Sequence, residues 1–456
     1  MIPLCRLHTL PYQADPAVYF SRVHREAGAV LLDSGRPVAD RGRYDILSAW
    51  PLTSFSPEVE EDGLAFFRRL RVSLRDLGQA QFEDGVQLPF AGGLLGYLPY
   101  EFGERLEAPS RITNPDVGGE HEGAVDARLG LYDWALITDH QLGTSQLVFH
   151  PSCAASKQQH VAAMFSNDSQ AASGSDFQLS RGFRPSIDRR IYQQAITRIQ
   201  DYIRAGDCYQ VNYTQRFHAE YRGDPWVAYC LLRQACATPF AGFVNLGGDN
   251  AILSLSPERF MRLQQGRIEA RPIKGTRPRG NTPEADRANA EDLCRSVKDR
   301  AENVMIVDLL RNDIGRSSKI GTVHVPELCS LESYPNVHHL VSCVQGELAE
   351  GLDVFDLLAT SFPGGSITGA PKIRAMEIIN ELEPTPRSVY CGSLLYIDVR
   401  GAMDSSIMIR TLLAQNGHIH CWGGGGIVAD SQWESEYQES LDKVGVLLKT
   451  LQQMMP

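Results

Sequence analysis

The sequence predicts an α+β fold with largely antiparallel β-sheets, and two observations support this. Short apolar runs typical of strands, such as 29–33 and 92–97, occur beside stretches whose apolar residues recur at helical spacing. These strand-like and helix-like segments do not alternate regularly, as they would in a fold built around a parallel sheet. No repeat of fixed period is present in the sequence.

The elements after residue 186 are predicted from spacing and from capping residues. The helix predicted at 187–205 has apolar residues at helical spacing. Thr282 and Pro283 fit the N-cap and the first residue of the next helical region, for which the prediction allows a break. Ser431 and Glu434 fit a capping box that opens the last helix. The predicted helices cover 187–205, 286–310, 371–382 and 431–451, and the predicted strands cover 251–255, 267–273, 393–397 and 406–411.

Composition divides the chain of 456 residues into three parts. Residues 1–150 mix short strand-like runs with turns, and we predict an N-terminal region there. Residues 151–185 are rich in small and polar side chains, which is typical of a linker or mobile loop. Residues 186–450 are denser in glycine, proline and charged residues, and we predict a catalytic domain in this part.

Charge and apolar content exclude some classes of function. The net charge of -11 argues against a nucleic-acid surface, because phosphate contacts need a basic patch. No apolar stretch reaches the roughly 20 residues needed to span a bilayer, and residues 1–6 lack a signal-peptide pattern. The ten cysteines form no C-x-x-C pair, so free thiols are expected. We therefore expect a cytoplasmic protein that binds neither nucleic acid nor a membrane.

Two pairs of carboxylates have the spacing of one helix face. Asp299 and Glu302 are three residues apart on one predicted helix. Glu436 and Glu439 repeat this spacing on the last helix, and Lys443 lies four residues further on. Two facing pairs would suit Mg²⁺, which takes oxygen ligands and keeps waters. Either pair alone is more often a solvated helix face.

Lys274 is a candidate nucleophile beside Gly275, at the end of a predicted strand. A lysine amine attacks only when neutral, and burial together with nearby cations such as Arg271 and Arg277 lowers its pKa. Taken alone, a lysine in this position is more often a surface residue. Glu258 is a candidate acid/base group, for which an ordinary ion pair with an arginine is the alternative.

Two glycine-rich segments could bring a ligand close to the backbone. Residues 364–369 precede a predicted helix, where free N–H groups can bind an anion, but their spacing fits neither a phosphate loop nor a dinucleotide motif. Residues 423–426 precede the last helix, and a tight turn is the alternative there.

Taken together, these segments resemble the chorismate-utilising enzyme family, in the order expected of it. The resemblance covers 186–450 strongly and 1–150 more weakly. It implies the fold of anthranilate synthase component I, in which largely antiparallel sheets pack as a sandwich with flanking helices. The matching segments are 206–212, 256–260, 272–276, 299–303, 307–313, 339–342, 364–372, 409–411, 424–430 and 436–443.

At two positions the chain resembles the para-aminating branch of that family. Gln210 stands where members that hydroxylate chorismate have a water-activating lysine, and Lys274 stands where anthranilate synthases have alanine. The resemblance implies that Lys274 attacks C2 of chorismate as hydroxide leaves C4, after which ammonia attacks C4 and expels the lysine. Glu258 is the expected general acid/base, and 4-amino-4-deoxychorismate is the expected product, for para-aminobenzoate and folate biosynthesis.

The same resemblance implies the metal ligands and the substrate contacts. Mg²⁺ would be held by Glu302, Glu436 and Glu439, with Asp299 in support. Trp422 is a departure, because a small residue is expected at that position. The expected substrate-binding residues are Gly275, Thr276, His339, Ser366, Tyr396, Arg410, Gly424, Gly425, Gly426 and Lys443.

The sequence also implies partners. No glutaminase segment is recognisable, so ammonia is expected from a separate glutamine amidotransferase subunit (component II) or from free ammonium. No lyase is recognisable either, so a downstream lyase would act separately. The N-terminal region resembles the tryptophan-binding part of anthranilate synthases, with Ser34, Tyr44, Pro239 and Phe240 as the lining. The alternatives are an anthranilate-forming enzyme and an inactive tryptophan-binding subunit.

Overall fold

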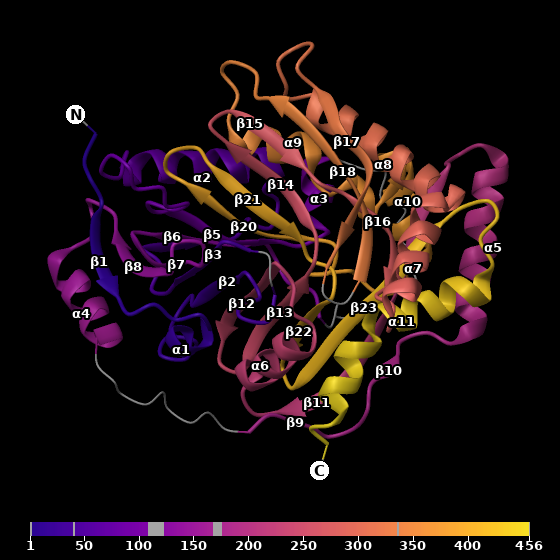
Figure 1. Ribbon diagram of the computed structural model, residues 1–456, viewed down its shortest axis with the longest axis horizontal. Helices are drawn as coiled ribbons and strands as arrows, with labels where there is room; N and C mark the ends of the chain where they lie inside the picture. The colour runs from indigo at the N-terminus through magenta and orange to yellow at the C-terminus, as the bar shows by residue number, and fades with distance from the viewer. Residues whose placement is uncertain (1, 40–41, 108–122, 167–175, 335–336, 456) are drawn as a thin grey trace.

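The computed structural model describes residues 2–39, 42–107, 123–166, 176–334 and 337–455. In these ranges two sheets, of 13 and 10 strands, form the frame of the molecule, and helices lie around them (Figure 1). Neighbouring strands are antiparallel in both sheets, for example where β11 pairs with β23 and β16 pairs with β18. The predicted α+β class with antiparallel sheets is therefore confirmed.

The larger sheet has the order β1-β8-β7-β3-β2-β12-β13-β22-β23-β11-β10, and β9 and β19 also pair with β11. Its strands are β1 (Arg6–Leu10), β2 (Val30–Asp33), β3 (Tyr44–Ser48), β7 (Trp134–Asp139), β8 (Thr144–Phe149), β9 (Gln178–Leu179), β10 (Arg184–Pro185), β11 (Gln210–Arg222), β12 (Phe240–Gly247), β13 (Asn250–Ser256), β19 (Gly369–Ala370), β22 (Thr411–Gln415) and β23 (His418–Ile427).

The smaller sheet has the order β16-β18-β15-β14-β21-β20-β5-β6-β4, and β17 also pairs with β18. Its strands are β4 (Thr53–Phe55), β5 (Gly93–Leu98), β6 (Arg128–Tyr132), β14 (Arg259–Gln264), β15 (Arg267–Ala270), β16 (Ile273–Pro278), β17 (His324–Ser333), β18 (Val337–Glu347), β20 (Ser393–Asp398) and β21 (Met403–Ile407).

Helices α7, α8, α10 and α11 lie on the side of β16 and β23 (Figure 1). The helices are α1 (Ala17–Phe20), α2 (Gly63–Leu77), α3 (Phe102–Leu106), α4 (Ala155–Ser166), α5 (Arg189–Ala205), α6 (Pro225–Ala235), α7 (Pro283–Arg295), α8 (Val297–Gly315), α9 (Val354–Ser361), the 3-10 turn η1 (Gly365–Ile367), α10 (Lys372–Leu382) and α11 (Trp433–Gln452).

Strands from the N-terminal 150 residues complete both sheets. In the larger sheet β2 pairs with β12, and in the smaller sheet β5 pairs with β20. The segment predicted as a linker or loop contains the helix α4, and its residues 167–175 lie outside the described part of the chain. The three-part division of the chain stays a prediction.

Capping residues set the helix boundaries largely as predicted. Thr282 accepts a hydrogen bond from the Ala285 N–H and begins α7, with Pro283 as its first residue. The break in the long helical region falls at Ser296, whose hydroxyl accepts from the Asp299 N–H and begins α8. The predicted capping box at Ser431 is wrong, because that hydroxyl instead donates to a carboxylate inside the helix.

Two predicted strands are each divided in the structure. The predicted strand 267–273 is split between β15 and β16, and 406–411 spans the end of β21 and the start of β22. Arg410, between the latter two, has a φ of 49°, which L residues adopt rarely and which interrupts the extended chain. The glycines 423–426 lie inside β23 and do not form a turn.

Apolar side chains cover both faces of the larger sheet. Adjacent residues of β13 point to opposite faces, so Ile252 enters the core shared with Leu95 and Ile397 of the smaller sheet. Leu253 enters a second core with Leu447 of α11. Burial of such side chains stabilises the fold by about 1.5–3 kcal/mol each.

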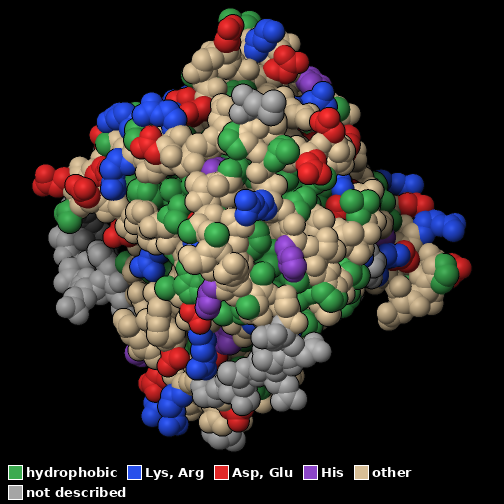
Figure 2. Space-filling view, turned by 90° about the vertical axis from the view of Figure 1, so that its left-hand side faces the viewer, with side chains coloured by type: hydrophobic (Ala, Val, Ile, Leu, Met, Phe, Trp, Pro, Cys, Tyr) green, Lys and Arg blue, Asp and Glu red, His purple; other side chains and the backbone are tan. Residues whose placement is uncertain are grey.

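The cysteines, the helices and the surface charge can be compared with the expectations from composition. All ten cysteines are free thiols, as predicted, and seven of them are buried. No helix in the described ranges combines the length and the apolar character needed to cross a membrane. On the face beside the N-terminal strands, charged side chains of both signs are interspersed (Figure 2).

Candidate active site

Lys274 is directed by a bulge in β16. The register of β16 against β18 shifts between Lys274 and Thr276, so Gly275 is the extra residue of a β-bulge, a feature that re-aims neighbouring side chains. Gly275 has a φ of 80°, and a Cβ there would lie 3.0 Å from Asp299 and 2.8 Å from Leu293. The glycine of the Pro272–Thr276 motif is therefore required both by conformation and by the close approach of α7 and α8.

The amine of Lys274 is held against the turn that precedes α10. Its Nζ donates to the carbonyl of Ser366 at 3.2 Å, and the side-chain amide of Asn212 donates to the same carbonyl at 2.9 Å. Burial lowers the pKa of Lys274, and the ammonium of Lys443 acts in the same direction, whereas the carboxylate of Glu258 opposes both. A lysine with a lowered pKa is neutral more often and hence a better nucleophile.

Glu258 lies beside this lysine, between β13 and β14, and is 6% exposed. Burial raises the pKa of Glu258 to about 7, although Lys274, the Ile273 N–H and the Ser366 hydroxyl each favour the ionised form. A carboxyl group with this pKa can both give and take a proton at neutral pH. The structure therefore brings the predicted nucleophile and the predicted acid/base group together.

Three carboxylates gather where α8 and α11 face Lys274. Burial raises the pKa of Glu302 and of Glu436, and the charge of Glu439 adds to the rise in each. Partial desolvation acts to raise the pKa of Glu439, whose side chain is 46% exposed, but Lys443 at 2.6 Å and other lysines outweigh it, so the net shift is downward. Glu436 is further fixed by the Ser431 hydroxyl, which donates to it at 2.7 Å.

The glycines of β23 form the floor below these carboxylates. A Cβ on Gly425 would lie 3.0 Å from Glu439 Oε1, 3.5 Å from Glu436 Oε2 and 3.5 Å from Lys443 Nζ. Lys443 Nζ donates to the carbonyl of Gly424 at 2.9 Å. A Cβ on Gly426 would overlap the buried amide of Gln210, at 2.3 Å. These glycines keep the backbone accessible where any side chain would fill the site.

The carboxylate set suits a hard divalent cation. Like charges gather at Glu302, Glu436 and Glu439, and lysines, among them Lys298 at 4.0 Å from Glu302, partly offset them. Oxygen ligands of this kind are those that Mg²⁺ prefers. Across the described residues, no three His, Cys, Asp or Glu side chains converge as a preformed metal cluster. Glu302, Glu436 and Glu439 thus fit Mg²⁺ by donor type and charge, although their side chains do not form a preformed cluster.

A Gly425→Ala variant tests this floor. The added methyl group would press on Glu439 and Glu436, so the apparent affinity for Mg²⁺ and the rate of turnover should each fall by about 10-fold or more. Gly445→Ala, on the same helix as the carboxylates but with open space around it, should leave both values unchanged. A steady-state Mg²⁺ titration of both variants measures the effect. Equal Mg²⁺ affinities and turnover rates in the two variants would contradict a close approach of Gly425 to the carboxylates.

His339 and its neighbours form a second side of the site. His339, on β18, is 6% exposed, and its Nδ1 lies 2.9 Å from the hydroxyl of Thr276. Burial, followed by the nearby charge of Arg410, lowers the pKa of His339 to about 4, so the imidazole is neutral at neutral pH. The structure thus brings Thr276, His339 and Arg410 together beside the Lys274 bulge.

Two predicted residues have other surroundings. Asp299 forms an ion pair with Arg277 at 3.2 Å and packs on Gly275, so its carboxylate is already occupied. Tyr396, on β20, contacts the Phe90 ring and lies near the charges of Asp404 and Arg259. The described contacts of Tyr396 therefore do not group it with Lys274.

The four residues of the predicted tryptophan pocket lie on or next to the neighbouring strands β2, β3 and β12 of the larger sheet. Ser34 is buried, and its hydroxyl has no hydrogen-bond partner in the described structure. The Tyr44 hydroxyl donates to the Gln87 carbonyl at 2.8 Å, and the Arg259 guanidinium lies 5.1 Å from the Phe240 ring centroid. Pro239 immediately precedes β12, at the start of which Phe240 lies.

Trp422, the departure from the family pattern, is a core residue. It is 1% exposed, its indole N–H donates to the Pro386 carbonyl at 3.1 Å, and its ring stacks on Tyr390 at 6.3 Å. It therefore packs behind the glycine strand and supports the segment that follows α10.

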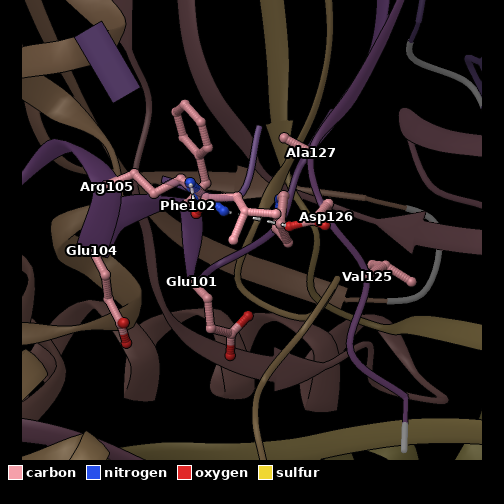
Figure 3. Close-up of a pocket in the computed structure, with 9 residues that line it drawn as sticks. Glu101, Phe102, Glu104, Arg105, Val125, Asp126 and Ala127 are labelled. Atoms are coloured by element: carbon pink, nitrogen blue, oxygen red, sulfur yellow. Dashed lines mark hydrogen bonds and ion pairs between the residues drawn. The ribbon is translucent and has the colours of Figure 1, made fainter. Parts of the chain in front are cut away.

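The candidate site around Lys274 does not coincide with the larger of two cavities in the structure. A cavity of about 210 Å³ lies at α3, where Arg105 and Asp126 face each other at 3.9 Å and Glu101 and Glu104 point away from them (Figure 3). The cavity at Glu258 and Ser366 measures only about 10 Å³. The concentration of perturbed groups and accessible backbone around Lys274, and not volume, identifies the candidate site.

Comparisons with known proteins point to one family. The sequence pattern of the family described as chorismate binding enzyme matches residues 42–449. Aminodeoxychorismate synthase component 1 of Salmonella typhimurium is 45% identical, over 97% of this chain and 98% of its own. Anthranilate synthase component 1 of Pseudomonas aeruginosa is 40% identical, over 78% and 74%. The crystal structure of anthranilate synthase component I from Streptococcus pneumoniae superposes with a TM-score of 0.74 at 28% identity, over 89% and 92%.

Proposed function

The chain belongs to the family of chorismate binding enzymes, and we propose that it converts chorismate and ammonia to 4-amino-4-deoxychorismate, the para-amination carried out by aminodeoxychorismate synthases. One observation carries this proposal. Lys274, with a lowered pKa, lies beside Glu258, whose pKa is raised to about 7. A nucleophile and an acid with matched protonation states are what two successive displacements require.

In the first displacement the neutral amine of Lys274 forms a bond to C2 of the ring. Both ring double bonds shift by one position, and the bond from C4 to its hydroxyl breaks. Glu258 gives its proton to the departing hydroxyl, which leaves as water. The result is a secondary ammonium joining Lys274 to C2, with Glu258 as a carboxylate.

In the second displacement ammonia forms a bond to C4, the double bonds return, and Lys274 leaves C2 as a neutral amine. The carboxylate of Glu258 takes the extra proton from the new ammonium at C4, which restores both residues to their starting state. Because each displacement moves the site of attack, two of them return the nitrogen to the carbon that lost the hydroxyl.

The remaining residues bind and orient the substrate in this proposal. Mg²⁺, when bound by Glu302, Glu436 and Glu439, would neutralise and orient the ring carboxylate. Arg410 and Lys443 would contribute charge for the carboxylates. The backbone of Gly424–Gly426 would allow the substrate to approach closely.

Removal of Mg²⁺ should abolish product formation, and added Mg²⁺ should restore it. A Glu302→Gln variant should need at least about 10-fold more Mg²⁺ for half-maximal rate, because one charged ligand is lost. The raised pKa values of Glu302 and Glu436 mean that these groups take up protons at higher pH than ordinary carboxyls, so Mg²⁺ affinity should fall as pH falls. Steady-state rates over a range of Mg²⁺ concentrations check the first two statements, and calorimetric titration at several pH values checks the third.

Glu291→Gln is the matched control for that titration, because Glu291 is an exposed glutamate on the neighbouring helix α7 that pairs only with Arg295 at 3.5 Å among the described contacts. It should leave the Mg²⁺ requirement unchanged. If the Glu302→Gln variant binds Mg²⁺ with wild-type affinity, Glu302 is not a ligand of the metal.

The ammonia is proposed to come from a separate amidotransferase subunit, in keeping with relatives that are named as component 1. The decisive assay combines the purified chain with chorismate, Mg²⁺ and ammonium, with and without an added lyase. Para-aminobenzoate should form only with the lyase. Ortho-aminobenzoate would overturn the proposal in favour of anthranilate formation. The absence of any product would favour the alternative that the chain is an inactive tryptophan-binding subunit.

A second ligand, tryptophan, is proposed for the N-terminal region. The supporting observation is a pair of buried hydroxyls, those of Ser34 and Thr238, that have no hydrogen-bond partner within the described ranges. Buried polar groups are normally satisfied, so a ligand with polar groups would account for them. Equilibrium binding of tryptophan to the chain, compared with a Ser34→Ala variant, tests this site.

A further inference from the structure

Arg387 is a fully buried charged residue for which the reaction above has no use. It follows α10, is 1% exposed, and donates to the Glu383 carboxylate at 2.7 and 2.9 Å. Its other two hydrogen bonds among the described residues go to main-chain carbonyls, those of Ile367 and Asn212, each at 2.8 Å. Its guanidinium also lies 4.6 Å from the centroid of the Tyr100 ring.

The backbone around Arg387 is held as firmly as its side chain. The carboxylate of Glu101 accepts from the N–H groups of Arg387 and Ser388, at 2.7 and 3.1 Å. Trp422 contacts the preceding residue through its indole N–H, as described above. Ser388 and Cys391 both have positive φ values, 53° and 65°, although neither is glycine. Backbone of this kind persists only where the surroundings over-determine it, and it is often found at functional sites.

The two carbonyls that Arg387 binds belong to the segments that hold Lys274. Ile367 follows Ser366, whose carbonyl accepts from Lys274 Nζ. Asn212 donates its side-chain amide to that same carbonyl. Arg387 therefore fixes the main chain on both sides of the one acceptor that the structure records for the amine of Lys274, and Glu383 adds a third link by accepting from the Thr214 N–H at 2.9 Å.

Stability alone is a poor reason for this arrangement. Taking a guanidinium and a carboxylate out of water costs several kcal/mol per ion, and well-packed apolar residues can replace a buried pair with little loss. What apolar residues cannot do is direct several main-chain carbonyls into one geometry. The fork of the guanidinium, with its five N–H donors, is suited to that task.

We propose that Arg387 is a positioning residue, which fixes the carbonyl of Ser366 and thereby the attacking direction of Lys274. Among the described contacts Arg387 touches neither Arg410 nor Lys443, so its main effect is expected on the chemical step. This inference rests on the proposed function through its assignment of Lys274 as the nucleophile.

Arg387→Lys is the first test, because it keeps the charge and loses the fork. The turnover number should fall by about 10- to 100-fold, the cost of a displacement of about 1 Å at a reacting group, while the KM for chorismate should change by less than about threefold. Independently of turnover, Lys274 should react about threefold or more faster with a small amine-reactive reagent, because its hydrogen bond to the Ser366 carbonyl is held less firmly. Peptide mass spectrometry measures that rate, with exposed Lys319 of the same chain as the reference.

Arg233→Lys is the matched control. Arg233 is 5% exposed and binds Asp33, Asp15 and the Arg36 carbonyl, so its burial and bonding resemble those of Arg387. It contacts none of the segments near Lys274 among the described residues. A fall in thermal stability shared by the two variants, without a change in Lys274 labelling or turnover specific to Arg387→Lys, would show a purely structural role and overturn the inference.

If Arg387→Lys does not fold, Glu383→Gln decides the matter, because it preserves the shape of the pair and removes one charge. It should lower turnover by about 3- to 10-fold and speed Lys274 labelling in the same direction. Wild-type values for both would overturn the inference. A wild-type chain that makes no para product would instead count against the proposed function. The labelling rate of Lys274 does not depend on that product, so it would still test whether Arg387 positions Lys274.

Discussion

Replacing Lys274 with alanine is expected to lower the rate of para-amino product formation by about 10³-fold or more. The loss is large because the proposed route has no first displacement without the amine, and single removals of a covalent nucleophile commonly cost this much. Any product that remains should carry nitrogen at C2, since one displacement by ammonia places it there. Chromatography of the products, after incubation with chorismate, Mg²⁺ and ammonium, gives both quantities.

Lys319→Ala is the control for that experiment, because Lys319 is exposed and its recorded hydrogen bonds use the main chain only. It should retain the full rate. Intact mass spectrometry of the wild-type chain with chorismate and Mg²⁺, but without ammonia, should show an adduct of chorismate less one water, which Lys274→Ala should not form. An unchanged rate of para product in Lys274→Ala would rule out an obligatory lysine adduct.

The second large effect is expected from Glu258→Gln. Glutamine keeps the size of the side chain but cannot protonate the departing hydroxyl, so turnover should fall by about 10²- to 10⁴-fold. In the wild-type chain the pKa of Glu258 is about 7, and the proposed acid is the protonated form. The rate should therefore decline as pH rises through about 7, and that decline should be absent from the variant.

The acid side of the pH profile should move as well. The negative charge of Glu258 raises the pKa of Lys274, in opposition to burial, so its removal should lower that pKa further. The neutral amine then exists at lower pH, and the acid limb of the variant should shift downward. Glu350→Gln, at an exposed turn, should keep the wild-type profile. A variant that retains the alkaline decline would identify another group as the acid.

Much of the site was predictable because it is encoded in short motifs. Lys274, Glu258 and the carboxylates of α8 and α11 each lie in such a motif, and local spacing was enough to place Lys274 on a strand and the carboxylates on helices. The Thr282 cap and the break at Ser296 follow equally from local hydrogen bonding. The confirmed antiparallel α+β class rests on the same local reading.

The errors have both local and distant causes. Ser431 fits a capping box in sequence, but the buried carboxylate of Glu436, five residues further on, takes its hydroxyl. For the glycines 423–426 the alternative of a tight turn is wrong, because pairing with the distant strand β11 draws them into β23. Arg387 gave no signal in the sequence, because its partners Asn212 and Ile367 are brought to it only by the fold. No local pattern records such contacts.

The pairing of β5 with β20 has a consequence for how the chain is made. Leu98 pairs with Ser393, so β5 leaves the ribosome about 300 residues before its partner exists, a wait of roughly 15 to 60 s at typical rates of synthesis. During that time an apolar strand has an open edge, which is a recognised risk for aggregation. We therefore expect newly made chain to depend on chaperones until its last strands emerge, and maturation in vivo to be limited by synthesis of the C-terminal third.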